Sequence, residues 1–236
     1  MTRRLRVASY NIRKSIGTDR RRDPMRVLDV INRLEADVVA LQEVDRRLGN
    51  RPTVLARERI AEETDFVVAD LARNDVSLGW HGNAVLVKKG LTIHGVSHIT
   101  LPGFEPRGAV QVDVGNDSAR LSLVGAHLGL LRPDRRAQLA AIRAHLADQD
   151  LPNSVILGDF NEWSPTKGLE ALSGDFDVVS PGKSYHSAYP LAGLDRVALG
   201  RRICLLNAGV DESELAKVAS DHLPIWGEIE IGPENE

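Results

Sequence analysis

Short apolar segments rich in β-branched residues recur along the whole chain, and they limit its possible folds more than any other feature. They predict β-strands at residues 5–10, 37–42, 84–89, 109–114, 119–126, 154–159 and 224–231. Two segments between them, 23–36 and 133–149, predict helices, because each has a proline at its start and apolar residues along one face. Strands interleaved with helices indicate an α/β protein built in layers.

The order strand, loop, helix, strand occurs near the N-terminus and again in the middle of the chain. In each half the apolar strands end in polar residues, Asn11 and Glu43 in the first and His127 and Asp159 in the second. Strand ends of this kind converge at one edge of a layered core, where α/β proteins usually form their sites. We therefore expect the two halves to face each other across one cleft.

The composition describes one globular unit. Because 42% of the 236 residues are hydrophobic, the chain can bury one large core, and we expect a single domain over residues 1–236. The 30 basic and 33 acidic residues leave a net charge of -3, which argues against a chain-wide positive field for nucleic acid but permits a local basic patch. Aromatic residues amount to 4%, which argues against a surface that stacks successive bases.

The sequence also limits which targeting signals and which cysteine chemistry are possible. The first apolar run is interrupted too soon for a signal peptide, and no run reaches membrane-spanning length, so we expect a soluble cytoplasmic protein. Cys204 is the only cysteine, so neither an intrachain disulfide nor a cysteine-based zinc site can form. We expect its side chain to fill space in the core.

Glu43 follows an apolar strand and is a candidate metal ligand. A buried strand has no packing use for a carboxylate at its end, whereas Mg²⁺ takes one or two carboxylates and keeps its other positions for water and phosphate. The alternative is a solvated strand end in which Glu43 pairs with Arg46 or Arg47.

Asp159 and Asn161 come after four apolar residues and Gly158, which lets the backbone turn. Residues two apart on an extended chain share a face, so this carboxylate and this amide suit the placing of an attacking water beside a phosphoryl oxygen. The alternative is a local turn in which the Asp side chain bonds to the backbone.

Asp195 lies in an otherwise apolar stretch and needs a partner if it is buried. We prefer His222, which directly precedes the last predicted strand, because a carboxylate that orients an imidazole prepares a general base or acid. A structural ion pair between Asp195 and Arg196 is the alternative.

Eight short motifs follow one another along the chain: SYNIR, LQEVD, GNAVLV, PRGAV, GAHL, GDFN, LDRV and SDHLPI. Their order resembles the endonuclease/exonuclease/phosphatase superfamily, which includes deoxyribonuclease I, exonuclease III, bacterial sphingomyelinases and inositol polyphosphate 5-phosphatases. The resemblance extends from about Asn11 to Pro224. It implies a deoxyribonuclease I-like α/β (α+β) fold, a four-layer sandwich of two packed β-sheets flanked by helices.

The resemblance also implies roles at the metal and at the attacking water. Asn11 and Glu43 are expected to bind the catalytic Mg²⁺ or to support its ligands, and Asp221 is expected near the metal. Asp159 is expected to position or activate the attacking water, and Asn161 to stabilise the phosphorane.

For the imidazoles, the resemblance implies that His222 bonds to the scissile phosphate or acts as the base, supported by Asp195. His127 is expected to point at a phosphate oxygen or at the leaving group. The remaining histidines match no such position and are expected to be ordinary loop or surface residues: His81, His94, His98, His145 and His186.

Three further residues are expected to bind substrate. Arg132 leaves the loop after His127, and its forked guanidinium suits phosphate oxygens. Arg107 and Asn83 resemble an arginine and an asparagine that recur near the cleft of the superfamily. Arg135 and Arg136 are expected to be solvated helix residues.

Together these roles predict a Mg²⁺-dependent phosphoesterase, with Mn²⁺ as a possible substitute, that hydrolyses a phosphodiester or phosphomonoester by in-line attack of water. The expected substrate is a small molecule or a lipid head group. A DNA or RNA nuclease is the alternative, and a catalytically silent binding module is a third hypothesis. Trp80 and Trp163 are expected to be half-buried packing residues, with contact to a lipid or a base as the other interpretation.

Overall fold

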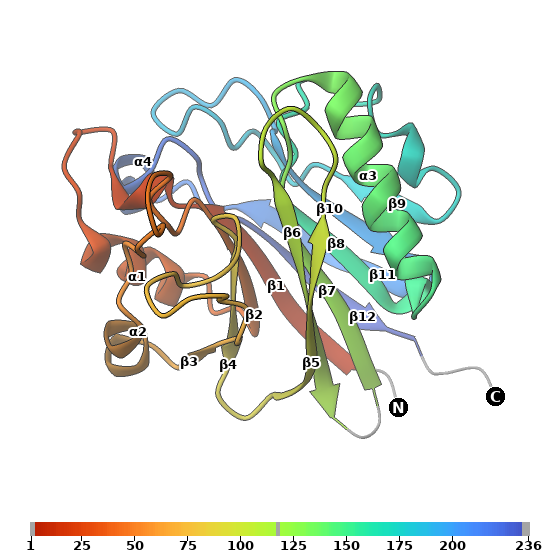
Figure 1. The fold of residues 1–236 in the computed structure, drawn as a ribbon, viewed down its shortest axis with the longest axis horizontal. Coiled ribbons are helices and arrows are strands. Elements are labelled where there is room, and N and C mark those ends of the chain that lie inside the picture. The colour runs from red at the N-terminus through yellow and green to blue at the C-terminus, as the bar shows by residue number, and fades with distance from the viewer. Residues whose placement is uncertain (1–2, 117–118, 233–236) are drawn as a thin grey trace.

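Two six-stranded β-sheets carry the fold in the computed structural model, which describes residues 3–116 and 119–232 (Figure 1). The first sheet contains, in spatial order, β11 (Ile203–Val210), β12 (Ile225–Ile231), β1 (Arg3–Asn11), β2 (Val38–Gln42), β4 (Ala84–Lys88) and β3 (Phe66–Val68). The second contains β5 (Thr92–Thr100), β6 (Gly108–Asn116), β7 (Ala119–His127), β8 (Ser154–Asp159), β10 (Asp195–Gly200) and β9 (Phe176–Val179).

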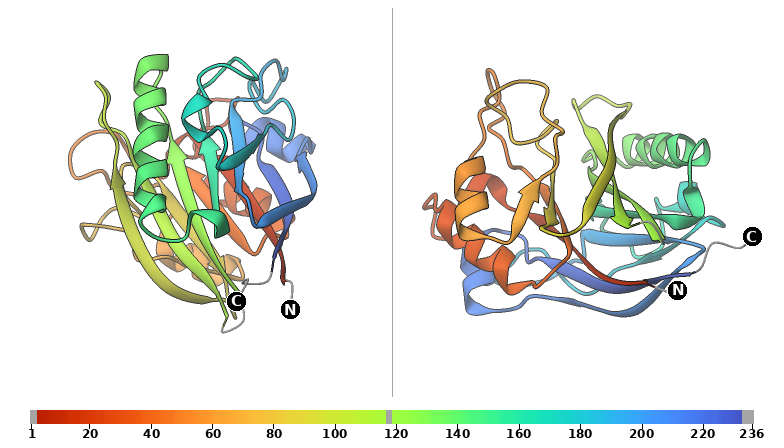
Figure 2. Two further views of the ribbon diagram at one scale, coloured as in Figure 1. Left: turned by 90° about the vertical axis from the view of Figure 1, so that its right-hand side faces the viewer. Right: turned by 90° about the horizontal axis from the view of Figure 1, so that it is seen from below.

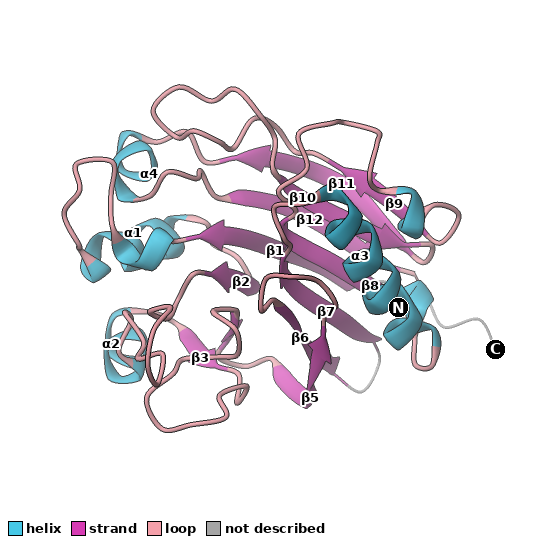
Figure 3. Cartoon of the chain, turned by 45° about the horizontal axis from the view of Figure 1, so that its top comes forward, coloured by secondary structure: helices cyan, strands magenta, loops and turns pink. Residues whose placement is uncertain are grey.

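Helices cover the outer face of each sheet. The first sheet is covered by α1 (Pro24–Arg33), α2 (Arg57–Glu63) and α4 (Glu214–Ala219), and the second by α3 (Arg132–Ala147) (Figures 2 and 3). Two short 3₁₀ helices, Leu151–Asn153 and Glu170–Leu172, pack beside α3. Within the described ranges, none of these helices is both long and apolar enough to cross a membrane.

The main apolar core lies between the two sheets. It includes Val7 and Val85 from the first sheet and Val112 and Leu157 from the second. Ile156, one residue before Leu157, packs instead in the cluster under α3, because successive residues of a strand point to opposite faces. The central strands of each sheet are therefore buried on both faces, and the layer order helix, sheet, sheet, helix confirms the expected fold class.

The two halves recognised in the sequence form the middle of the two sheets. β1 and β2 are parallel and are joined through α1, while β7 and β8 are parallel and are joined through α3. A parallel pair needs such a crossover, and it places the C-terminal ends of both strands at the same edge. Because β1 packs against β8, and β2 against β7 and β8, these edges face each other.

Each predicted strand is present, with ends within two residues of the expected ones. Helix α1 begins as expected, with Asp23 accepting a hydrogen bond from the Arg26 amide at 3.1 Å and Pro24 in the first turn. It ends at Arg33, short of the predicted residue 36, because Glu35 has a left-handed backbone with φ of 49°.

The expectation for Cys204 is wrong. Its side chain is exposed, because it lies on β11, a strand at the edge of the first sheet where one face is open to solvent. The sequence around it is apolar, but the alternation of a half-exposed strand directs this residue outward.

Candidate active site

Three buried polar residues form a row across the second sheet. His127 pairs with Asp159 in the register of β7 and β8, and Asp159 pairs with Asp195 in the register of β8 and β10. The exposed fractions of the three residues are 5%, 1% and 0%. Adjacent strands thus bring together residues that lie far apart in the sequence.

Asn11 from the first sheet and His222 from the loop before β12 each add a nitrogen atom to this row. Asn11, the last residue of β1, donates from Nδ2 to Asp159 Oδ2 at 3.1 Å. The Nε2 atoms of His127 and His222 lie 3.5 and 3.6 Å from the same oxygen. Both sheets therefore meet at Asp159 Oδ2, and four residues singled out in the sequence converge there.

Asp195 is the partner of His222, as expected from the sequence. His222 Nδ1 donates to Asp195 Oδ2 at 2.9 Å, and the Ser184 hydroxyl donates to the same oxygen at 2.5 Å. Arg196 instead donates to the backbone carbonyls of Glu162 and Ser164, which excludes the alternative ion pair.

His222 is held in its charged form. Burial alone would lower its pKa, but the carboxylates of Asp195 and Asp159 outweigh this effect and raise the pKa to about 10. The ring is therefore an imidazolium at neutral pH, with Nδ1 bonded to Asp195 and Nε2 directed towards Asp159.

His127 is held in the opposite state. Burial lowers its pKa to about 3, because the attraction of Asp159 is too weak to compensate and Arg107 and His222 add repulsion. One carboxylate is thus flanked by a neutral and a charged imidazole. This arrangement offers an acceptor or neutral donor on one side of Asp159 and a proton donor on the other.

Asn161 reaches the site by a different route from the one expected. It lies beyond the end of β8 with φ of 51°, so strand alternation does not orient it. Its amide N–H donates to Asp159 Oδ1 at 2.9 Å, which is the local turn considered as the alternative. Its side-chain Nδ2 donates to the carbonyl of Leu128 at 2.9 Å, which ties the loops after β7 and β8 together.

Two carboxylates lie at the ends of the first sheet with basic partners. Glu43 forms an ion pair with Lys14, rather than with Arg46 or Arg47, and Asp221 pairs with Arg13 at 3.2 Å. Burial would raise the pKa of Glu43, but Lys14 overrides this effect and lowers it. Glu43 is therefore ionised in the folded protein.

A metal ion fits the chemistry of this site. Asp159, Asp195 and His222 form a cluster that could hold one, because each offers a ligand atom and these atoms lie within 4.8 Å of one another. A charged imidazole, however, has no lone pair for a metal, and Asp195 is already engaged by His222. Glu43 and Asp221 are more accessible, with 17% and 20% of their side chains exposed, and carboxylate oxygens are the donors that Mg²⁺ prefers.

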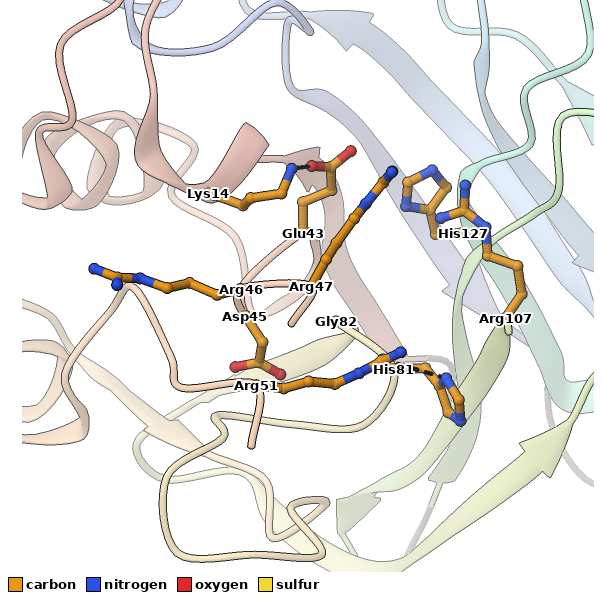
Figure 4. Close-up of a pocket in the computed structure, with 10 residues that line it drawn as sticks. All are labelled: Lys14, Glu43, Asp45, Arg46, Arg47, Arg51, His81, Gly82, Arg107 and His127. Atoms are coloured by element: carbon orange, nitrogen blue, oxygen red, sulfur yellow. Dashed lines mark hydrogen bonds and ion pairs between the residues drawn. The ribbon is translucent and has the colours of Figure 1, made fainter. Parts of the chain in front are cut away.

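Of the expected substrate-binding residues, Arg107 lies in the pocket that also contains Glu43 and His127 (Figure 4). Glu105 holds its guanidinium through two bonds of 3.1 and 2.8 Å. Asn83 is buried instead at the start of β4, where Nδ2 donates to the Gly108 carbonyl at 2.9 Å. Asn83 therefore connects the two sheets below the pocket.

Arg132 does not reach this pocket. Glu162 binds its guanidinium through two bonds of 3.0 and 2.7 Å, and Glu162 also binds Arg135 at 2.7 Å. The expectation that Arg135 is solvated is wrong, since only 5% of it is exposed. Arg136 is exposed, as expected, and pairs with Glu170.

Sequence reasoning missed several residues around the site. Lys14, Arg47, Arg51 and His81 line the same pocket as Glu43 and His127. The run of arginines after Glu43 is the signal that could have indicated Arg47 and Arg51. Lys14 follows the SYNIR motif directly, whereas His81 carries no local signal and was expected to be an ordinary loop residue.

The aromatic residues beside the motifs behave differently from one another. Trp80 packs against His98 and against the backbone of Gly108, as expected. Trp163 is 61% exposed, so the expectation of a half-buried packing residue is wrong for it. Its ring contacts Tyr185 edge-on, and the Tyr185 ring centroid lies 4.9 Å from that of His222.

Comparison with solved structures places this fold among known ones. A Beutenbergia cavernae endonuclease/exonuclease/phosphatase is 22% identical with a TM-score of 0.73, covering 98% of this chain and 72% of that one. D. rerio TDP2 complexed with a single-strand DNA product is 13% identical with a TM-score of 0.66, covering 96% and 98%. A Bacteroides thetaiotaomicron mannosyl-6-phosphatase is 15% identical with a TM-score of 0.73, covering 95% and 99%. These likenesses establish the fold, and no curated protein matches the chain.

The family comparison covers almost the whole chain. The Endonuclease/Exonuclease/phosphatase family model matches residues 8–222, which include every site residue from Asn11 to His222. Members of this superfamily are hydrolases that act on phosphoester bonds. The match confirms the resemblance carried by the order of the eight motifs. The chain belongs to the endonuclease/exonuclease/phosphatase family.

Proposed function

We propose that the protein is a Mg²⁺-dependent phosphoesterase that hydrolyses a phosphodiester or phosphomonoester bond by in-line attack of water. The observation that carries this proposal is the convergence of Asn11, His127 and His222 on one oxygen of Asp159. Phosphoryl transfer requires little covalent chemistry from a protein. It requires a positioned nucleophile and positive charge where negative charge develops.

The residues around Asp159 divide these tasks. Asp159 accepts a hydrogen bond from the attacking water and orients it, while the Asn161 amide holds the carboxylate in place. His222 is charged, so of the two roles considered for it we propose hydrogen-bond donation to a phosphoryl oxygen, not removal of a proton. Asp195 keeps the ring oriented and charged. His127, being neutral, donates to a phosphoryl oxygen or the leaving group without adding a second charge.

Glu43, Asp221 and Asn11 are the residues that we propose to hold Mg²⁺. The bound ion supplies a Lewis acid that neutralises charge on the phosphoryl oxygens. Lys14 and Arg13, which pair with the two carboxylates in the structure, have to move aside or remain on the outer oxygens. Arg107 is held by Glu105 at the mouth of the pocket and is proposed to contact the phosphate. Arg132 and Asn83 stay as expectations for substrate contact.

Two substrate classes remain as candidates. A small phosphate ester is the first, and a related fold is that of a mannosyl-6-phosphatase. A nuclease is the second, and the observation that favours it is the group of arginines, Arg46, Arg47, Arg51 and Arg107, around the pocket. The net charge of -3 means that such a patch would have to act locally.

Hydrolysis of bis-p-nitrophenyl phosphate tests the activity. The wild-type protein should hydrolyse it with Mg²⁺ or Mn²⁺ and should lose this activity in chelator. Asp159→Asn should lower the rate by about a thousandfold or more, because several kcal/mol of barrier lowering depend on this group. Asp177→Ala, an exposed acid on β9, is the control and should leave the rate unchanged. Full activity in chelator would contradict the metal-dependent mechanism.

A further inference from the structure

We propose that Arg47, Arg51 and His81 form a second anion-binding subsite beside the reaction centre, so that the natural substrate carries a second phosphoryl group next to the bond that is hydrolysed. This inference rests on the proposed function, because it describes the rest of the molecule that the reaction centre acts on. It goes further than that function by naming the class of substrate.

The subsite is continuous with the reaction centre. Two adjoining pockets share Arg47, Arg51, His81 and Arg107. The inner pocket also contains Glu43 and His127, and the outer one extends to Glu105 and Pro106. In Figure 4, Arg47 extends towards His127, whereas Arg46 points away from the other residues and is left out of the proposal.

The charges in these pockets are not balanced by the protein. Lys14 and Arg107 each have a carboxylate partner, Glu43 and Glu105. Arg47 and Arg51, by contrast, form no ion pair with any residue of 3–116 or 119–232. Two guanidinium groups in one pocket repel each other unless an anion lies between them.

Asp45 is a further carboxylate on the pocket wall, but within the described part of the chain it forms no ion pair with Arg51. The residue is 4% exposed, and Oδ1 accepts the Leu78 amide at 2.9 Å. Burial raises the pKa of Asp45, although Arg51 and Arg57 act to lower it. Asp45 therefore holds the loop before β4. Even with Asp45 counted as charged, the five basic side chains Lys14, Arg46, Arg47, Arg51 and Arg107 outnumber the three carboxylates of Glu43, Asp45 and Glu105 around the two pockets.

His81 connects the subsite to both sheets. Its Nδ1 donates to the Pro106 carbonyl at 2.9 Å, which joins the loop before β4 to the loop before β6. Arg51 Nη1 lies 3.4 Å from the same nitrogen, and among the described residues Nε2 has no hydrogen-bond partner. Burial, with repulsion from Arg51 and Arg73, lowers its pKa, so the ring is neutral without an anion. A bound anion would supply the missing negative charge and favour the imidazolium.

The charge count favours phosphate over carboxylate. A phosphate monoester carries close to two negative charges at neutral pH, and two guanidinium groups balance them, whereas a carboxylate would leave one guanidinium unpaired. Arginine also matches phosphate oxygens with two parallel hydrogen bonds. The charge count fits the phosphate monoester of a small bisphosphorylated molecule. The next phosphodiester of a nucleic-acid strand carries one negative charge and would be bound through the paired hydrogen bonds alone, so the experiment has to separate these two sources.

Binding of inorganic phosphate, followed by the imidazole NMR signals, tests the subsite directly. The His81 signal reports on the subsite, and the His222 signal reports on the reaction centre. In the wild-type protein both signals should shift. Arg47→Ala or Arg51→Ala should weaken the affinity read from His81 by about tenfold, because each substitution removes a charge-assisted hydrogen bond to the anion. The His222 response should stay within about twofold of the wild type.

Arg201→Ala is the matched control, because Arg201 follows the far end of β10 from Asp195 and its removal changes the net charge equally. A shift at His222 alone, or a His81 response that neither variant weakens, overturns the subsite and leaves the proposed function intact. Failure to hydrolyse bis-p-nitrophenyl phosphate would instead count against the proposed function.

Kinetics then distinguish the two sources of the second phosphate. Thymidine 5′-p-nitrophenyl phosphate is compared with the same ester carrying a 3′-phosphate, and both are compared with single-stranded oligo(dT). A preference of about tenfold for the phosphorylated ester that disappears in Arg47→Ala identifies a small-molecule subsite. A loss of activity confined to oligo(dT) identifies a strand phosphate, provided that the slope of log affinity against log salt concentration also falls by about 0.7. If neither substrate responds to either substitution, the subsite is refuted.

Discussion

His127 and His222 lie on either side of Asp159, yet their surroundings give them opposite charges. His222 has Asp195 at 2.9 Å as a second carboxylate, so two negative charges outweigh its burial. His127 has only Asp159, at 3.5 Å, and it also faces Arg107. A difference of one neighbouring carboxylate therefore decides which imidazole can give a proton to a substrate.

These charge states predict a pH dependence. In NMR titrations His222 should remain protonated at pH 8, and His127 should remain neutral at pH 5. In the unfolded chain His127 binds a proton near pH 6.5, whereas in the folded protein it stays neutral down to about pH 3. Protonation therefore favours the unfolded state, and the protein becomes less stable as the pH falls from about 6.5 towards 3. His222 stabilises fully below about pH 6.5, and this contribution is lost as the pH rises towards 10.

Urea unfolding as a function of pH measures both effects. His222→Asn should flatten the alkaline decline of the free energy of unfolding, and His127→Asn should flatten the acid decline. An alkaline decline of the same size in His222→Asn would contradict the assignment of the charged state to this residue.

Glu162 explains why Arg132 lies outside the pocket that contains Glu43 and His127. It is 1% exposed, binds Arg132 and Arg135, and keeps a pKa of about 2 against the opposing effect of burial. We expect Glu162→Gln to lower the free energy of unfolding by about 3 kcal/mol, because it leaves the buried Arg135 without a countercharge. Urea denaturation measures this change. The control, Glu170→Gln, removes an exposed pair with Arg136 and should cost less than about 1 kcal/mol.

At the scale of the elements, the alignment of β7 with β8 places His127 beside Asp159. Gly158 makes this alignment possible, though not by turning the chain as expected from the sequence. It lies within β8 with φ of 151°, and an added Cβ would overlap the carbonyl oxygen of Ala126 on β7. Only a residue without a side chain lets the two strands approach here.

Gly158→Ala should therefore damage both stability and activity. The overlap is with backbone, which cannot rotate away, so we expect a loss of about 3 kcal/mol or more and a large fall in the rate on bis-p-nitrophenyl phosphate. Thermal unfolding followed by circular dichroism measures the first effect. Gly90→Ala, at a position with φ of 95° and no neighbour within 4 Å, controls for backbone strain alone. Equal losses in both variants would show that the strand contact is unimportant.

The elements that sequence reasoning missed share a weaker signal. β5 and β11 are edge strands with one face partly exposed, so polar residues interrupt their apolar pattern. β3 and β9 contain only three and four residues. β10 is fully buried, but its first two residues are the charged Asp195 and Arg196, so its sequence does not form a continuous apolar run. Strands buried on both faces, such as β2 and β8, were predictable because their apolar runs are continuous.

At the scale of the whole molecule, one apolar core contains residues of both sheets. The single domain over residues 1–236 stays a prediction. We therefore expect one cooperative unfolding transition. Trp226 lies on β12 of the first sheet, Trp80 packs against Gly108 at the start of β6 in the second, and Trp163 is exposed beside Tyr185. Urea curves from tryptophan fluorescence and from circular dichroism should coincide. Two separated transitions would mean that the sheets unfold independently.

The positions of the chemical groups along the chain were determined by the sequence alone. A polar residue that ends a buried apolar strand has few structural reasons to be there, so Asn11, Glu43, His127 and Asp159 could be selected without coordinates. The order of the motifs identified the family in the same way, because it does not depend on geometry.

Tertiary structure alone decided which of these groups meet and in what charge state. Asp159 lies opposite Asn11 because two sheets pack face to face. Glu162, in the loop after β8, forms an ion pair with Arg132 at the start of α3. His81 enters the pocket through a loop whose sequence carries no signal. Pairing, burial and pKa depend on neighbours that are distant along the chain, and a one-dimensional pattern contains no information about the distances between them.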